Sequence, residues 1–293
     1  MVFQQIFDGL TLGMVYALIA VGYSLVFGIL RLINFSHGSV YAFGAHIALV
    51  VVVSMQWGVI WGLCISIIVT GLLGVAIDKL SLEPLRKKGS KPISALITTI
   101  GVSYIIQNLL MILLGSQSKW FPKLFDYGRL HIFGRIGISY TQLGIFLVSV
   151  ILLLFLTVVI QRTKIGLAMR AVEQNPKAAH LMGIDVNRVV SFTFFLGGAS
   201  AAIAGTLISG YYQVVYFNMG FIAGLKAFSA AVLGGIGVLY GSVIGGLVVG
   251  LSESFAASYL GGGYRDAIAF LILIIVLILK PNGLFGKKAV EKV

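Results

Sequence analysis

Long apolar runs are the feature of this sequence that most constrains its fold. They lie near residues 7–30, 36–54, 59–80, 93–114, 140–161, 188–212 and 264–280. A helix needs about 20 apolar residues to cross a bilayer, so each run predicts a membrane-spanning helix. The composition agrees, because 59% of the residues are hydrophobic and 10% are charged, whereas a soluble domain has roughly 25% charged residues. The sequence therefore predicts an all-α, polytopic membrane helix bundle in which residues 1–293 form a single transmembrane domain.

A further apolar region, residues 222–258, is interrupted by glycines and brings the expected number of transmembrane helices to about eight. Its apolar pieces before Gly234 and Gly235 are too short to span a bilayer alone. In transporters such segments often form discontinuous helices along the substrate path, which makes two short helices or a re-entrant pair the expectation. The alternative is that glycines spaced four residues apart allow helices to pack closely. The glycines assigned to such packing are Gly9, Gly13, Gly237, Gly241 and Gly245.

Basic residues are distributed unevenly along this chain of net charge +12. Of the 21 Lys and Arg residues, 15 are Arg31, Lys79 or members of the segments 86–91, 162–188 and 280–292. The positive-inside rule makes these segments cytoplasmic and the N-terminus external. The loop 115–139 also holds four basic residues, but alternation of the spans puts it outside, where its aromatic residues suit the headgroup layer. Because the charge follows the membrane topology, the sequence predicts lipid and not nucleic acid as a partner.

Polar residues within the apolar part of the chain are candidates for a translocation pathway, because polar groups in lipid are costly. We assign Asn34, His37, Tyr41 and Glu253 to this pathway. For residues 34–38 the alternative is a plain cytoplasmic turn in which Ser36 caps the next helix. For Glu253 the alternatives are an ion pair or solvation near an outer helix end.

The segment 161–188 is a polar interruption between two long apolar runs. Asn175 is a good helix N-cap, Pro176 suits the first helical position, and Gly183 can adopt the left-handed conformation that ends a helix. The pattern predicts a capped helix of about two turns on the basic side of the membrane. Such a helix suits docking to another protein; the alternative is an ordinary cytoplasmic loop that contains a helix.

Motifs for catalysis are absent from the sequence. There is no G-x-x-x-x-G-K-[ST] phosphate loop, no H-E-x-x-H motif and no serine in a G-x-S-x-G context. The single cysteine, Cys64, lies in an apolar run without metal-ligand neighbours. The chain is therefore expected to be no enzyme and to hold no metal or cofactor, so that any ATP is used on another chain.

Three stretches resemble the permease subunits of branched-chain amino acid ABC transporters. They are LINFSHGSVYAFGAH (32–46), RAVEQNPKAAHLMGID (170–185) and AFSAAVLGGIGVLYGSVIGGLVVGLSES (227–254). The resemblance extends over essentially the whole chain and fits best the shorter of the two permeases. It implies an importer in the bacterial cytoplasmic membrane with a second homologous permease and an extracytoplasmic substrate-binding protein. Two cytoplasmic ATP-binding subunits, with ATP and Mg, complete the implied assembly.

The same resemblance implies a role for the polar segment, about 162–188, as the coupling segment. Permeases of ABC importers often present a cytoplasmic helix with the pattern E-A-A-x-x-x-G, which docks on the ATPase. Here Lys177 replaces the glutamate, Glu173 can supply that charge one turn earlier, and Leu181 and Met182 can fill the groove. The residues assigned to coupling are Glu173, Asn175, Pro176, Lys177, Ala178, Ala179, His180, Leu181, Met182 and Gly183.

The cargo follows from the resemblance alone. Branched-chain or related hydrophobic amino acids are expected, and similar systems carry urea, amides or other amino acids. A stand-alone channel or an ion-coupled carrier is the rival class. It needs a cation or proton site, and the sequence offers no pair of carboxylates inside the spans.

Overall fold

The computed structural model describes residues 2–125, 128–132 and 136–286. These residues form a helical bundle with eight helices that are long and apolar enough to cross a membrane, which confirms the predicted fold class. The spanning helices are α1 (Val2–Leu30), α2 (His37–Leu49) with its π-helical continuation η1 (Val50–Ser54), α3 (Val59–Ile77) continuing through η2 (Asp78–Leu82) into α4 (Glu83–Lys87), α5 (Pro92–Leu114), α6 (Tyr140–Arg162), α9 (Val186–Tyr212), α11 (Leu239–Tyr259), and η3 (Gly262–Tyr264) with α12 (Arg265–Leu279).

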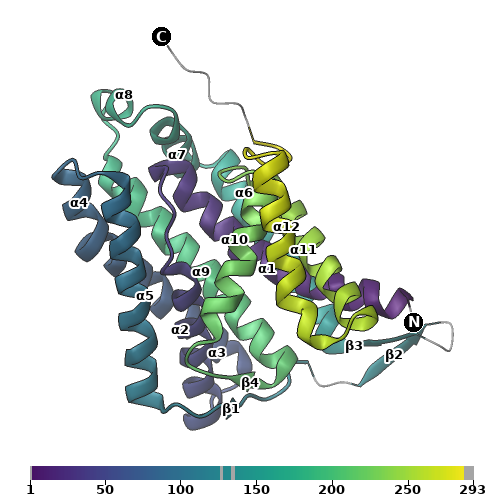
Figure 1. The fold of residues 1–293 in the computed structure, drawn as a ribbon. Helices are drawn as coiled ribbons and strands as arrows, with labels where there is room; N and C mark the ends of the chain where they lie inside the picture. The colour runs from purple at the N-terminus through teal and green to yellow at the C-terminus, as the bar shows by residue number, and fades with distance from the viewer. Residues whose placement is uncertain (1, 126–127, 133–135, 287–293) are drawn as a thin grey trace.

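Helix α1 lies at the centre of the bundle, where it packs against α9, α10 (Met219–Gly234) and α11 (Figure 1). It is hydrophobic on all sides, as expected of a helix surrounded by other helices. Helices α5, α6 and α12 lie at the periphery and leave most of their apolar side chains exposed. The core of the molecule is thus built mainly from α1, α2, α9, α10 and α11.

The glycine-interrupted region forms two helices joined by a tight turn. Helix α10 has 16 residues and α11 has 21, so α11 is long enough to span a bilayer and α10 is shorter than a full span. Gly235 and Gly237 have φ angles of +101° and +91°, which side chains with a Cβ adopt only with strain. The segment that follows α12 caps the C-terminal end of α10, because the backbone N–H of Leu284 donates to the carbonyl of Leu233 at 2.8 Å.

The glycines assigned to packing have two different roles. A Cβ added at Gly9 or Gly13 would lie 2.8 Å from the Cα of Leu251 or Leu247 of α11, so α1 and α11 approach at backbone contact. Gly241 and Gly245 bring α11 equally close to α10. Gly237 differs from the prediction: it lies in the turn before α11 rather than on a helix face, because its positive φ is needed to reverse the chain.

The basic segments gather at one end of the bundle. Figure 1 shows α4, α7 (Lys164–Gln174), α8 (Pro176–Leu181) and the C-terminal end of α12 at this end. At this end Asp78 is fully buried, forms an ion pair with Arg86 and accepts a hydrogen bond from Ser191 of α9 at 2.7 Å. These contacts fix the cytoplasm-predicted end of the continuous α3–η2–α4 helix to α9.

Short strands occupy the opposite end, where the sequence predicted only an aromatic loop. Strand β1 (Lys119–Trp120) pairs with β4 (Val214–Val215), and β2 (Arg129–Ile132) pairs with β3 (Ile136–Ser139), both antiparallel. Predicted loop or tail residues that lie outside the described part of the chain are Tyr127, Phe133, Arg135, Lys287, Lys288 and Lys292.

Candidate functional site

Glu253 lies in a buried ion pair between helices. Its Oε1 is 3.0 Å from Lys226 Nζ of α10, and its Oε2 accepts a hydrogen bond from the Tyr16 hydroxyl of α1 at 2.7 Å. Both charged side chains are buried. A charge removed from water needs a partner of opposite sign and further hydrogen bonds, and this arrangement supplies both. The geometry therefore favours the pairing alternative for Glu253 and links α1, α10 and α11.

A second carboxylate extends this network toward solvent. Asp266 Oδ1, in the first turn of α12, is 2.7 Å from Lys226 Nζ, and the Asp266 side chain is 52% exposed. Lys226 thus bridges a buried and a half-exposed carboxylate. Because α12 has little other burial, this ion pair contributes to holding α12 against α10.

The other residues assigned to the pathway also lie in the packed interior. Asn34 is buried, and its Oδ1 accepts hydrogen bonds from the backbone N–H of Ser36 at 3.1 Å and from the Ser36 hydroxyl at 2.6 Å. Ser36 makes no capping bond of its own to α2, so Asn34 organises this turn. Tyr41 of α2 is buried, and its backbone carbonyl lies against Gly205 of α9.

His37 occupies a notch between α1 and α9. Its Nε2 lies against the Cα hydrogens of Gly22, where no larger residue would fit, and its ring meets the Tyr23 ring edge-on at a centroid distance of 4.8 Å. The His37 Nε2 atom is buried and has no hydrogen-bond partner among the described residues. Asn34, His37 and Tyr41 therefore support the start of α2 and do not line the cavity described next.

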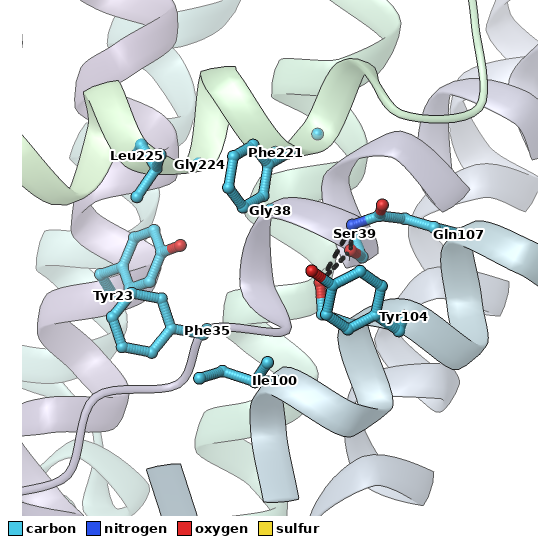
Figure 2. A pocket seen from close by; sticks show the side chains of 12 residues that line it. Tyr23, Phe35, Gly38, Ser39, Ile100, Tyr104, Gln107, Phe221, Gly224 and Leu225 are labelled. Atoms are coloured by element: carbon cyan, nitrogen blue, oxygen red, sulfur yellow. Dashed lines mark hydrogen bonds between the residues drawn. The ribbon is translucent and has the colours of Figure 1, made fainter. Parts of the chain in front are cut away.

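A pocket of about 220 Å³ opens between α2, α5 and α10, beside the predicted residues. Figure 2 shows two chemically different ends: Tyr23 and Phe35 at one, and Ser39, Tyr104 and Gln107 at the other. Its wall is completed by apolar side chains and by backbone at glycines. The remaining lining residues are Gly38, Ile100, Ser103, Gly220, Phe221, Gly224 and Leu225.

A hydrogen-bonded cluster forms the polar end of the pocket. Gln107 Nε2 donates to Ser39 Oγ at 3.0 Å and to Ser103 Oγ at 3.1 Å, and the two serine oxygens are 2.6 Å apart (Figure 2). This site was not predicted from the sequence. The available signal was the spacing of Ser103 and Gln107, which puts two polar groups on one face of an apolar helix.

The polar segment forms two short helices at the basic end. Asn175 Oδ1 accepts hydrogen bonds from the backbone N–H groups of Lys177 and Ala178 at 3.0 and 3.1 Å, which caps α8. Gly183 follows the helix with φ +85°, as expected of a glycine that ends a helix. Glu173 lies near the end of α7, close to Gly28 of α1. His180 is exposed, and Ala179 alone among the residues of α8 is buried.

Two apolar side chains stand out from this segment into solvent. Leu181 is 86% exposed and Met182 is 83% exposed. At the other face, Met169 and Val172 of α7 are buried against the core. The segment thus presents apolar surface away from the bundle while α7 anchors it to α1 and α9.

Fold and sites together define a polytopic membrane protein with an exposed helix at the basic end of its bundle. A family model described as the branched-chain amino acid transport system / permease component matches residues 5–277. The chain belongs to this family.

Individual relatives match over nearly the full length. The chain is 40% identical to the high-affinity branched-chain amino acid transport system permease protein BraD of Pseudomonas aeruginosa, over 99% of this chain and 97% of that protein. It is 39% identical to LivH of Escherichia coli K12 over the same shares. It is 29% identical to a probable LivH permease of Methanocaldococcus jannaschii, over 92% of this chain and 88% of that protein. Among solved structures, the chain is similar to a chain of PsaBC from Streptococcus pneumoniae in complex with Fab. The alignment covers 96% of this chain and 91% of that chain, with a TM-score of 0.47 and 15% sequence identity.

Proposed function

We propose that this chain is a membrane-spanning subunit of an ATP-binding-cassette importer that moves branched-chain or related hydrophobic amino acids into the cell. The observation that carries the proposal is the 40% identity to BraD over 99% of this chain. A second homologous permease completes the membrane part, and an extracytoplasmic substrate-binding protein delivers the cargo. Two cytoplasmic subunits bind ATP with Mg and supply the energy, while this chain provides the path through the cytoplasmic membrane.

Energy enters this subunit through α8. The exposed Leu181 and Met182 support docking in an apolar groove of an ATPase subunit, because adjacent large apolar side chains in water are typical of protein interfaces. A tilt of α8 is passed to α7, whose buried residues Met169 and Val172 contact the core. Since α7 packs on α1 and α9, a rigid-body movement reaches the centre of the bundle and switches its opening from outside to inside.

A charge placed in the docking surface tests this coupling. In Leu181→Asp and Met182→Asp variants, we expect binding-protein-stimulated ATP hydrolysis and amino acid uptake to fall by about 10-fold or more, because a carboxylate is desolvated at the interface. The matched control is Leu181→Met, which keeps the apolar surface and should retain uptake. The measurement is uptake and ATPase activity in liposomes that contain the complete transporter. Wild-type rates in both aspartate variants would exclude α8 as the coupling helix.

Purification in mild detergent separates the importer from its rivals. Co-purification of ATPases that bear phosphate loops and of a second permease supports the importer, and the ligand of the binding protein then distinguishes branched-chain amino acids from urea or amides. A chain that purifies alone and catalyses flux in ATP-free liposomes would instead be a channel or carrier.

A further inference from the structure

We propose that the pocket between α2, α5 and α10 is a contact site for an aliphatic α-amino acid during its passage through the membrane. The inference rests on the proposed function and names the residues at which the cargo touches this subunit. Three features support it: the depth of the polar cluster, the atoms that it leaves unbonded, and the shape of the apolar end.

The polar cluster lies at a depth where lipid cannot satisfy it. Ser103 is the middle residue of α5 (Pro92–Leu114), and Gln107 follows one turn later. The pocket opens at the side of the chain, where Tyr104 is 60% exposed and Phe221 is 54% exposed. Polar side chains within membrane helices face protein or a water-filled cavity, because hydrocarbon offers no hydrogen bonds. This face of α5 and α10 therefore adjoins protein or water in the assembled transporter.

Within the cluster of Ser39, Ser103 and Gln107, the hydrogen bonds leave one acceptor and one donor for a ligand. Gln107 directs its amide nitrogen toward Ser39 and Ser103, and none of the hydrogen bonds among the described residues uses its amide oxygen. The two serine hydroxyls share one hydrogen bond between them, which leaves one hydroxyl proton to donate. An α-amino acid presents an ammonium donor and a carboxylate acceptor on the same α-carbon, and these match the Gln107 oxygen and the free serine proton.

The opposite end of the pocket suits an aliphatic side chain. Phe35, Ile100, Phe221 and Leu225 contribute apolar surface. The wall between the two ends is nearly free of side chains, because a Cβ at Gly224 would lie 2.9 Å from the Cα of Gly38, and α2 and α10 cross at backbone contact. The volume of about 220 Å³ is below the roughly 300–1,000 Å³ of pockets for drug-sized ligands. It admits one small ligand.

The lining residues also exclude other classes of cargo. None of them carries a formal charge, so an ion or a ligand with net charge would lose its hydration without compensation. A sugar would leave most of its hydroxyl groups facing aromatic rings. A zwitterion with an aliphatic side chain uses both ends, and the absence of fixed charge keeps its binding weak enough for release on either side.

Cysteine accessibility tests whether this face is wet. Tyr104→Cys and Phe221→Cys are introduced separately into a Cys64→Ser background of the assembled transporter in liposomes, with Ile151→Cys as control. Ile151 is 61% exposed on α6, so it matches the test sites in exposure on another face. A membrane-impermeant methanethiosulfonate reagent reacts with the thiolate, which forms in water and not in lipid.

We expect modification at positions 104 and 221 to be at least about 10-fold faster than at position 151. When leucine-loaded binding protein is added, we expect the modification rates at 104 and 221 to decrease. Equal rates at the three sites would overturn the proposal.

Pocket-filling variants separate this inference from the proposed function. Ile100→Trp is expected to lower leucine uptake by about 10-fold while binding-protein-stimulated ATP hydrolysis stays near wild type, because the path is obstructed and coupling is not. Gln107→Leu, which keeps the size of the side chain, is expected to lower uptake without blocking the path, and Ile151→Trp is the control. Wild-type uptake in both pocket variants of an assembled transporter would overturn the pocket assignment. If the proposed function itself were wrong, the co-purification experiment would show this before any uptake is measured, because the chain would purify without ATPase partners.

Discussion

At the scale of single residues, the most consequential arrangement is the network around Lys226. Its ammonium lies 3.0 Å from Glu253 and 2.7 Å from Asp266, while Tyr16 donates to the second oxygen of Glu253. Each member comes from a different helix: α1, α10, α11 or α12. A network of this kind fixes helix register because each charge is compensated only in one arrangement.

Breaking the buried pair from one side tests this structural role. Glu253→Leu is expected to cost about 3 kcal/mol of stability, the lower end for breaking a buried pair, because Lys226 loses its buried partner and keeps only the half-exposed Asp266. The double variant Glu253→Leu with Lys226→Met removes both charges and is expected to recover most of that loss. The measurement is the thermal unfolding midpoint of the detergent-purified chain. If the single variant is as stable as wild type but uptake is lost, Glu253 acts in the pathway and not as a structural partner.

At the scale of elements, the contact of α1 with α11 depends on glycines that face each other. Gly250 lies against the backbone of Gly13, and Gly13 lies against Leu247. Close backbone approach increases dispersion contact, which is the main attraction between helices in lipid. The tight interface therefore explains why α1 can be central and hydrophobic on all sides.

A single methyl group tests this interface. Gly13→Ala is expected to lower the unfolding midpoint, because its Cβ would lie 2.8 Å from the Cα of Leu247 and the helices must separate. The loss should be about 1–3 kcal/mol. Gly101→Ala on α5 is the matched control, since no atom lies within 4 Å of its added Cβ and alanine favours a helix. An equal decrease in both variants would point to a general effect of the substitution rather than to helix contact.

At the scale of the whole molecule, the charge distribution and the fold agree on which segments share one side. The segments around α4, α7 and α8 lie together at one end, and the paired strands lie at the other (Figure 1). From the positive-inside rule we expect the first end to be cytoplasmic. With this orientation, the proposed function places α8 toward the ATP-binding partners and the strands toward the binding protein.

Labelling of single cysteines tests the orientation. Ser90→Cys lies between α4 and α5, and Gly263→Cys lies in η3 before α12; each is placed in a Cys64→Ser background. An impermeant maleimide added to the outside of intact spheroplasts is expected to label position 263 and not position 90, because the latter belongs to a basic loop. Position 90 should become labelled after permeabilisation. Labelling of position 90 in intact spheroplasts would reverse the topology.

The sequence by itself determined the fold class, the approximate bounds of the spans and the capped helix α8. These features depend on runs of about 20 apolar residues and on local signals such as Asn175, Pro176 and Gly183, which act within one or two helical turns. The sequence also identified Glu253 as a residue in need of an explanation.

Only the tertiary structure decided which side chains meet. Lys226 and Glu253 are 27 residues apart and Tyr16 is 237 residues from Glu253, so no local pattern could pair them. The same holds for the pocket: Ser39 meets Gln107 across 68 residues. Neighbouring residues of α2 point to different helices, so Ser39 lines the pocket while His37 lies buried against α1. Hydrophobic periodicity could not predict this division, because α2 carries polar residues on opposite sides and has no single apolar face, so its rotation is fixed by packing.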